Sequence, residues 1–222
     1  MPLQALGFVC IKSIKESPMF KKLLVLMSFL ALLPMQAMAE ELAPQDVIKT
    51  AVGGVIDVLK VRKDQTSLSS EDRDAIRKAV DGYFDFPEMA KRALAAPWKE
   101  LNDTQKKEFV ATFQELLELT YGNRLADYHD QKIEYGEVFI KGRIAVVDSE
   151  VVDADKRTPV RYKLVHKDAG WGVYDIQIEG ISMVNTFRTD FSEAVNKDGI
   201  KGFLSGLKGR VTSLKEQDQS KG

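Results

Sequence analysis

The amino-acid sequence predicts an α+β protein in which helices pack on one face of a curved, four-stranded antiparallel sheet. Apolar residues recur with helical spacing from residue 44 to residue 128, and the pattern changes to alternation between residues 132 and 179. Helical spacing returns after Ser182. Helices, then consecutive strands with short connections, then helices again are typical of an α+β domain rather than of repeated βαβ units.

Three helices are expected in the first part of the domain. Residues 44–60 carry apolar side chains at i, i+3 and i+4, which predicts an amphipathic helix. Ser69 or Ser70 can cap a second helix after a polar linker. A third, short helix is expected to begin around Pro87 and to end at Pro97.

A longer helix is expected to begin near Asn102 or Thr104 and to be the most aromatic one in the protein. Its broad apolar stripe consists of Phe109, Phe113, Leu116, Leu117, Tyr121, Leu125 and Tyr128. One face of this helix is therefore predicted to be buried.

Four strands are expected next, because apolar and polar residues alternate between turn-like segments. They are residues 132–140, 142–153, 158–167 and 170–180. In the first strand, Ile133, Tyr135, Glu137 and Phe139 are expected to share one side. Helices are then expected at 182–196 and 198–207, followed by a polar and flexible tail over residues 208–222.

Residues 1–39 are predicted to be a leader that contains a secretory signal peptide over residues 19–39. Lys21 and Lys22 precede the apolar run LLVLMSFLALL, and an A-x-A site closes the segment, so cleavage is expected after Ala39. The run is shorter than the roughly 20 residues that a membrane span needs. We therefore expect an exported protein with a single domain over residues 40–207.

Charge and cysteine content exclude several classes of function. Removal of the leader takes four of the 32 basic and one of the 33 acidic residues, which leaves a net charge of −4. This balance argues against nucleic acid as a partner. Cys10, the only cysteine, lies in the leader, so the exported part is expected to have neither a disulfide nor a thiol nucleophile.

The remaining polar residues offer little chemistry. His129 and His166 fall in different predicted elements without acidic or cysteine neighbours at ligand spacing, so no metal site is expected. Ser182 lacks the second glycine of a nucleophile elbow and has no histidine downstream. No cofactor is expected, and the sequence favours a protein that is not an enzyme.

One enzymatic alternative stays open. Carboxylates lie on the predicted strands, and a carboxylate in a sheet cavity can act as a general base. Asp175 is the strongest candidate for such a base on an apolar small molecule. The other interpretation is an exposed or paired charge.

The large apolar side chains are the stronger signal, although periodicity does not distinguish a packed core from a cavity. A ligand-free interaction module with a solid core is therefore a further alternative. What favours a ligand is a resemblance: the segments YFDF, FVATFQELLELTY, GWGVYDIQIEGIS and FRTDF together resemble the MlaC family, in the order of that family. The resemblance spans nearly all of residues 44–207. Phe187-Arg188 stands where the family is expected to have Tyr-Arg.

The resemblance implies an NTF2-like fold that encloses an apolar pocket for the acyl chains of a glycerophospholipid. It implies a periplasmic protein of the Mla pathway that shuttles lipid and maintains outer-membrane lipid asymmetry. The implied partners are an outer-membrane lipoprotein–porin complex and an inner-membrane ABC transporter with an MCE-domain subunit. Toluene tolerance is the other function associated with the family.

The candidate lipid-binding residues come from the helices, the strands and the segment ISMVNTF. Met183, Val184 and Phe187 are expected to face the tails, with Arg188 near a phosphate. The full set is Phe84, Met89, Trp98, Phe113, Leu117, Tyr121, Tyr135, Tyr162, Leu164, Ile176, Ile178, Met183, Val184, Phe187 and Arg188.

Overall fold

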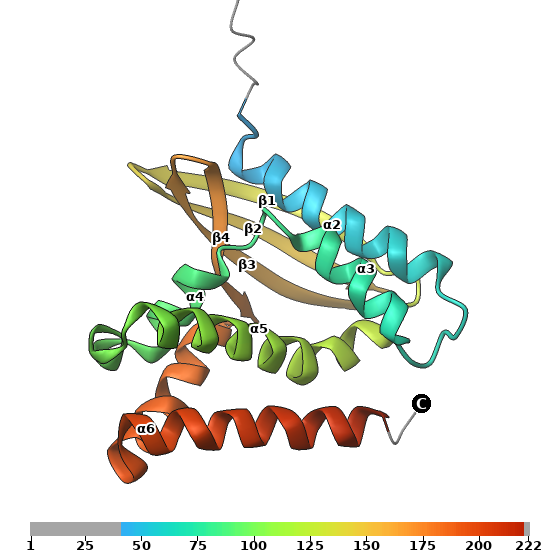
Figure 1. The fold of residues 1–222 in the computed structure, drawn as a ribbon. Coiled ribbons are helices and arrows are strands. Elements are labelled where there is room, and N and C mark those ends of the chain that lie inside the picture. Colours follow the sequence, from blue (N-terminus) through green and yellow to red (C-terminus); the bar gives the residue numbers. More distant parts are fainter. Residues whose placement is uncertain (1–40, 220–222) are drawn as a thin grey trace, which may run out of the picture. The chain divides into compact units, whose positions relative to one another are not determined.

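A computed structural model describes residues 41–219, and the predicted leader lies outside them. The helices are α2 (Pro44–Val61), α3 (Ser70–Val80), α4 (Phe86–Leu94), the 3-10 helix η1 (Ala96–Glu100), α5 (Asp103–Ala126) and α6 (Met183–Gln219). The strands are β1 (Lys132–Lys141), β2 (Ile144–Asp153), β3 (Lys156–Lys167), β4 (Gly170–Ile178) and β5 (Ile181–Ser182). They form one antiparallel sheet in the order β1-β2-β3-β4-β5 (Figure 1). The α+β prediction is confirmed, and β5 adds a short fifth strand to the predicted four.

The predicted helix starts are confirmed by their capping interactions. Ser69 and Asp72 form a capping box at the start of α3, and Asn102 and Gln105 form another at the start of α5. The Asp85 carboxylate accepts a hydrogen bond from the third residue after it and caps α4. Side-chain acceptors at these positions satisfy N–H groups that the first turn of a helix leaves unpaired, so the signal is local and readable from sequence.

The expected alternation along β1 fails halfway, because a β-bulge interrupts the strand between Tyr135 and Val138. Tyr135 lies opposite Ser149 and Val138 lies opposite Val147, and these two β2 residues share a face. Phe139 therefore lies on the other face from Tyr135, and the prediction that they share a side is wrong. One inserted residue shifts a two-residue period by one, and the apolar pattern does not reveal it.

The C-terminal region is more helical than expected. Helical backbone hydrogen bonding continues through α6 to Gln219, with a kink at Gly199, where φ is 66°. The predicted break between two helices is thus present as a kink, but the flexible tail predicted from residue 208 is wrong up to residue 219. Val211 is buried and Leu214 packs on the core, because they continue the helical spacing of Leu207.

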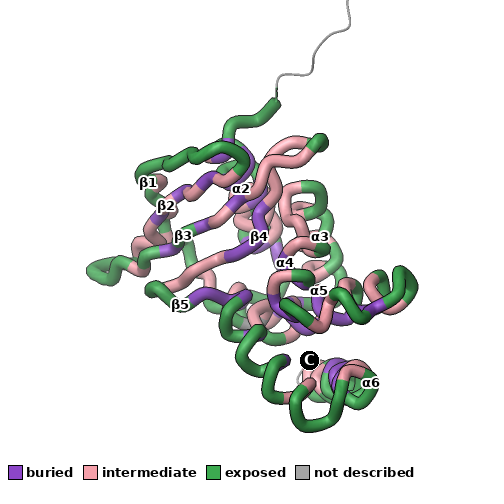
Figure 2. Tube along the Cα trace, turned by 90° about the vertical axis from the view of Figure 1, so that its left-hand side faces the viewer, coloured by how far each residue is buried: buried purple, intermediate pink, exposed green. Residues whose placement is uncertain are grey.

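Two main apolar clusters form the interior. The first, which we call the helical cluster, is built mainly from α4, α5 and α6, together with Tyr174 of β4. The second, the sheet cluster, joins Val47 and Ile48 of α2 to the side chains of β2, β3 and β4 that face this helix. Buried segments of both are seen along the tube in Figure 2. Among the described residues, no helix is long and apolar enough to cross a membrane.

Candidate functional site

The apolar residues predicted to bind lipid are divided between the two clusters. Met89, Phe113, Leu117, Met183, Val184 and Phe187 are buried in the helical cluster, with Trp98 and Tyr121 half-buried against it. Tyr162 and Leu164 are buried in the sheet cluster, with Tyr135 and Ile178 half-buried against it. Phe84 and Ile176 pack against both clusters. The structure therefore places the predicted apolar residues in two clusters that meet at Phe84 and Ile176, and we call this meeting point the junction.

The junction is organised by β4. The backbone N–H of Val173 donates to Tyr83 O, and the N–H of Asp85 donates to Val173 O, both at 2.8 Å. These bonds hold the segment before α4 beside β4 and place Phe84 between the clusters. Ile176 lies two residues before the end of the same strand, opposite Tyr162 of β3. Phe84 and Ile176 are both half-buried, so the two clusters meet through side chains that are not fully enclosed.

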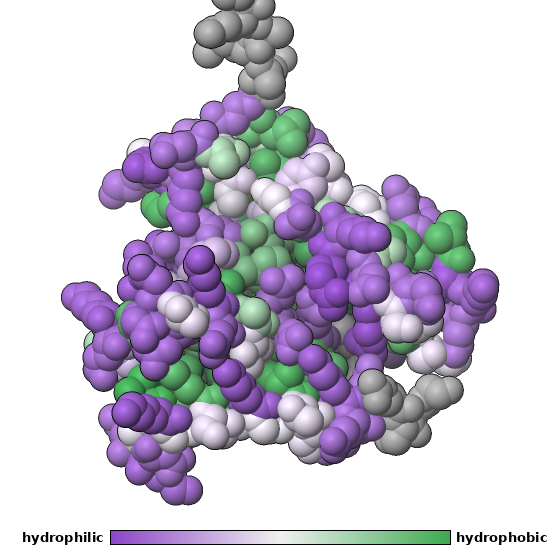
Figure 3. All heavy atoms as spheres, in the orientation of Figure 1, coloured by the Kyte–Doolittle hydropathy of each residue, from purple (hydrophilic) through white to green (hydrophobic). Residues whose placement is uncertain are grey.

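The helical side of the junction is a cluster of aromatic rings. Phe113 of α5 meets Phe187 of α6 edge to face, with ring centroids 5.3 Å apart. Tyr121 lies edge to face with Phe187 at 6.3 Å, and Phe191 lies 5.5 Å from Phe187. The rings converge because α5 carries Phe109 and Phe113 at i, i+4 spacing and α6 carries Phe187 and Phe191 at the same spacing. On the face drawn in Figure 3, apolar residues gather between α2 and α5 and again between α5 and α6.

Asp175 is buried at the start of α6, with 3% of its surface exposed. Ser182 Oγ donates to this carboxylate at 2.8 Å, the Val184 N–H donates to it at 3.2 Å, and Lys163 Nζ lies 3.2 Å from it. Ser182 Oγ also accepts a hydrogen bond from the Asn185 N–H at 3.0 Å. Asp175 and Ser182 thus cap the helix that carries Met183, Val184 and Phe187. The carboxylate is a paired charge with a structural task, and its bonding leaves it poorly placed to act as a base.

Arg188 lies on the surface, one residue beyond Phe187. Its Nε donates to the Arg92 carbonyl at the end of α4, at 2.9 Å. The Arg92 guanidinium lies over the Tyr174 ring, 4.0 Å from its centroid. Two arginines therefore lie beside the helical cluster, where their charged groups stay in reach of solvent.

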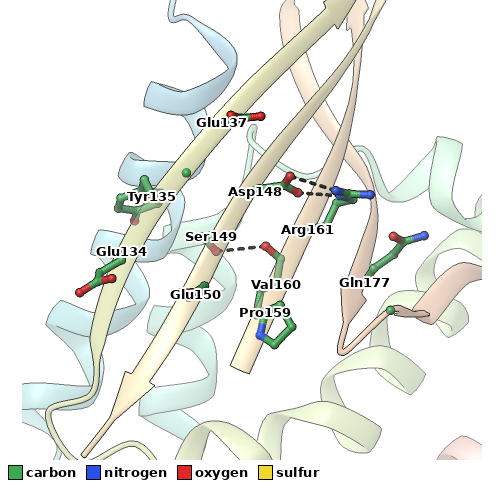
Figure 4. Close-up of a pocket in the computed structure, with 12 residues that line it drawn as sticks. Glu134, Tyr135, Glu137, Asp148, Ser149, Glu150, Pro159, Val160, Arg161 and Gln177 are labelled. Carbon is green, nitrogen blue, oxygen red and sulfur yellow. Dashed lines mark hydrogen bonds and ion pairs between the residues drawn. The ribbon is translucent and has the colours of Figure 1, made fainter. Parts of the chain in front are cut away.

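A groove of about 550 Å³ lies elsewhere, along the strands of the sheet (Figure 4). Arg161 crosses it with two bonds to Asp148, at 2.6 and 2.9 Å. Tyr135 is the one predicted lipid-binding residue that lines it; its lining residues are Glu134, Tyr135, Gly136, Glu137, Asp148, Ser149, Glu150, Pro159, Val160, Arg161, Gln177 and Gly180. A smaller pocket of about 290 Å³ lies between α5 and α6 beside Phe109. The residues that line these two pockets do not include Phe84 or Ile176.

The tyrosines of the interior are uncharged near neutral pH. Burial raises the pKa of Tyr162 to about 12. Burial also raises the pKa values of Tyr121, Tyr135 and Tyr174 above the usual value of 10. Removal from water disfavours the phenolate, so these rings add no negative charge to an apolar surface. Within residues 41–219 there is no group of three or more His, Cys, Asp or Glu side chains that could hold a metal ion.

The fold and this junction define an α+β protein in which a sheet and a set of helices both supply apolar, uncharged side chains to one interior region. Residues 49–209 match the MlaC protein family, and the chain belongs to that family. The resemblance found in its sequence motifs is thereby confirmed.

Similar proteins agree with this assignment. The chain is 26% identical over 197 residues to the toluene tolerance protein Ttg2D of Pseudomonas putida. The aligned region covers 86% of this chain and 91% of that protein. It is 26% identical over 155 residues to the intermembrane phospholipid transport system binding protein MlaC of Haemophilus influenzae, covering 67% and 70% of the two chains. It shares its fold with the phospholipid-binding protein of Ralstonia solanacearum, solved in complex with a phospholipid. That match has a TM-score of 0.73 at 24% identity and covers 78% of this chain and 99% of the other.

Proposed function

We propose that this protein is a periplasmic phospholipid carrier that holds the acyl chains of a glycerophospholipid at the junction of the helical and sheet clusters. The observation that supports the site is the meeting of both clusters at the half-buried Phe84 and Ile176. Tails entering there would contact sheet residues on one side and the rings around Phe187 on the other. We also propose that the fold is NTF2-like, as the family resemblance implies.

The energetics of lipid transfer favour an apolar interior of this kind. Two acyl chains carry on the order of 30 methylenes, and each costs about 0.8 kcal/mol to expose to water. A free phospholipid therefore does not cross an aqueous compartment at a useful rate. Contacts with rings and aliphatic chains are non-directional, so they can hold tails tightly without a fixed set of hydrogen bonds that would hinder release.

Entry and release would require the two clusters to separate. Helices α4 and α6 meet the sheet at β4 and β5, while α5 packs on α4 and α6. The contacts of these helices with the sheet are therefore concentrated at its β4–β5 edge. There, Asp175 and Ser182 anchor the start of α6. We propose that α4, α5 and α6 move as a group relative to β1, β2 and β3, with β4 as the common attachment. The head group would lie near Arg188, whose exposed guanidinium can bind a phosphate, whereas the neighbouring Arg92 already pairs with Glu88 at 2.9 Å.

The proposed route runs between the two membranes. We propose exchange of lipid with an outer-membrane lipoprotein–porin complex and with an inner-membrane ABC transporter that has an MCE-domain subunit. The result would be the maintenance of outer-membrane lipid asymmetry. Support comes from the name of the Haemophilus influenzae relative, an intermembrane phospholipid transport binding protein, and from the phospholipid in the Ralstonia solanacearum structure.

The enzymatic alternative has less support. A general base needs a free lone pair directed at a substrate, whereas the Asp175 carboxylate already accepts bonds from Ser182 and Val184 and pairs with Lys163. The residues lining the groove over the sheet do not include Asp175.

The decisive experiment is native mass spectrometry of the protein purified from periplasm, followed by identification of the extracted lipid. We expect one bound phospholipid per chain or a small whole number of them. The carrier proposal fails if the folded protein emerges lipid-free and does not extract phospholipid from vesicles. A bound apolar metabolite instead of a lipid would support the enzymatic alternative.

A pair of substitutions tests the location of the site. Ile178→Trp adds bulk to a half-buried side chain of the sheet cluster, and we expect the bound lipid to fall at least tenfold while the circular dichroism spectrum is retained. Val61→Trp is the control, because Val61 is 81% exposed on α2 and its replacement should leave lipid binding unchanged. Tyr121→Asp changes a half-buried ring of the helical cluster and should abolish binding from the helical side while the circular dichroism spectrum is retained. Full lipid occupancy in both Ile178→Trp and Tyr121→Asp would place the lipid elsewhere.

A further inference from the structure

Strand β1 is an edge of the sheet, and its two halves are protected differently. In the first half, Gln45 of α2 donates to Gly136 O at 3.1 Å, and Glu134 pairs with Arg157 at 2.7 Å. The bulge after Tyr135 follows. Charged residues, bulges and covering groups are the usual means by which an edge strand avoids pairing with another chain.

In the second half of β1, the stretch between Glu137 and Lys141 carries neither a charge nor a bulge. Val138, Phe139 and Ile140 are three consecutive apolar residues, with 37%, 57% and 58% of their surfaces exposed. Phe139 lies on one face of the strand and its two neighbours on the other, so both faces of the edge are apolar here. Figure 2 shows β1 exposed along this edge of the sheet. Exposed apolar edges of this kind are templates for pairing with another strand.

The charges that flank this segment are arranged with opposite signs. Glu137 precedes the apolar triplet and Lys141 follows it, and both side chains are exposed. Neither takes part in a salt bridge among the described residues. The segment thus begins with an acidic residue and ends with a basic one. When a second copy runs antiparallel to it, the acidic end of each copy faces the basic end of the other.

We propose that residues 137–141 pair with the same residues of a second copy of this chain, antiparallel and centred on Phe139. In this register Phe139 lies opposite Phe139, Val138 opposite Ile140, and Glu137 opposite Lys141. The pairing joins two sheets across a two-fold axis, forms an isologous interface and gives two Glu–Lys contacts. The proposal rests on the edge of the sheet and is independent of lipid binding.

Other alignments of the two β1 strands have less favourable charge contacts. A parallel alignment in register places Glu137 opposite Glu137 and Lys141 opposite Lys141, which is repulsive. An antiparallel shift that brings Phe139 opposite Glu137 leaves Lys141 beside Tyr135 and loses both charge contacts. The bulge also limits the ladder to a few residues, so the dimer is expected to be weak and to appear at high protein concentration.

Disulfide trapping tests the register directly. The chain has one cysteine, Cys10, so single cysteines can be introduced on a Cys10→Ser background. Directly opposed residues of antiparallel strands have Cα atoms about 4.5–5.5 Å apart, within disulfide range. We expect Phe139→Cys to form a disulfide dimer under mild oxidation.

Ile140→Cys is the matched control, because Ile140 is as exposed as Phe139 but would lie opposite Val138 rather than itself. It should cross-link poorly alone and efficiently when mixed with a Val138→Cys chain. Equal cross-linking of Phe139→Cys and Ile140→Cys would overturn the register. Cross-linking of Phe139→Cys in a periplasmic extract only to a different protein would assign the edge to that protein and overturn self-pairing.

Charge reversal provides an independent readout by sedimentation equilibrium. Lys141→Glu alone and Glu137→Lys alone should each weaken dimerisation roughly tenfold, because two attractive contacts become repulsive. An equimolar mixture of the two variants should recover the wild-type association, because acid again faces base at both ends. Absence of any recovery in the mixture, or a wild type that stays monomeric at millimolar concentration, would contradict the proposal.

Discussion

The helical cluster and the sheet cluster differ in the side chains that fill their centres. The helical cluster is rich in rings, and Phe109 and Phe113 at its centre are almost completely buried. The sheet cluster is built largely from β-branched and aliphatic side chains, with half-buried Tyr135, Trp171 and Ile178 along its margin. Both clusters have a buried centre and a half-buried margin, so the clearer difference is that aromatic rings fill the centre of one and aliphatic side chains the centre of the other.

Buried and half-buried side chains of these clusters are expected to have different roles, in stability and in ligand binding. Fully buried rings stabilise the position of α5 and α6 whether or not a ligand is present. Half-buried aliphatic side chains contribute less to stability, and they retain apolar surface that a ligand can cover. We therefore expect substitutions at the buried centre of the helical cluster to act mainly on folding, and substitutions at the half-buried margins, such as Ile178 of the sheet cluster, to act mainly on lipid binding.

The largest effect on stability is expected from Phe113→Ala. Phe113 is fully buried and contacts Phe109, Phe187 and Phe191, so its loss leaves a cavity that the surrounding rings cannot fill. The free energy of unfolding should fall by about 4 kcal/mol. Ile178→Ala is the comparison and should cost only about 1 to 2 kcal/mol, because Ile178 is already half-exposed. Urea denaturation measures both, and equal losses would remove the distinction between the clusters.

A smaller effect, in the buried part of the sheet cluster, is expected at alkaline pH. The pKa of Tyr162 is raised from 10 to about 12, so the folded state holds the phenolic proton more tightly than the unfolded state does. Its contribution is fully present below pH 10 and is lost as pH rises through 12, by about 3 kcal/mol in total. Denaturation midpoints between pH 8 and pH 12 should show this loss. Tyr162→Phe should remove most of it, and an unchanged pH profile in that variant would assign the loss to other groups.

The smallest of the three effects on stability is expected at the start of α6. Asp175→Asn removes a charge-assisted cap from α6 and should lower the free energy of unfolding by about 2 kcal/mol. Asp148→Asn is a suitable control, because Asp148 pairs with Arg161 near the surface, where such pairs contribute at most about 1 kcal/mol. Thermal unfolding compares the two variants. A larger loss in Asp148→Asn would show that Asp175 does not anchor the helix.

Much of the fold was predictable because its signals are local. Capping residues such as Ser69, Asp85 and Asn102 satisfy backbone groups within their own helices, and the change of apolar period at residue 132 separates helices from strands. The candidate lipid-binding residues came from a family resemblance, and the structure brings the apolar ones together in two adjoining clusters. Their contact with lipid stays a prediction.

The sequence by itself determined the helices, the main strands and their order, since hydrogen bonds within helices and the alternation of side chains depend on neighbouring residues. Only the tertiary structure decided which face Phe139 takes, that the chain after Lys208 stays helical, and that Asp175 caps α6. Each of these depends on contacts between different elements: the β2 register beyond the bulge, the core beneath Val211, and the Ser182 hydroxyl brought to β4 by β5. Long-range contacts are set by packing, and packing leaves no local pattern from which they can be read.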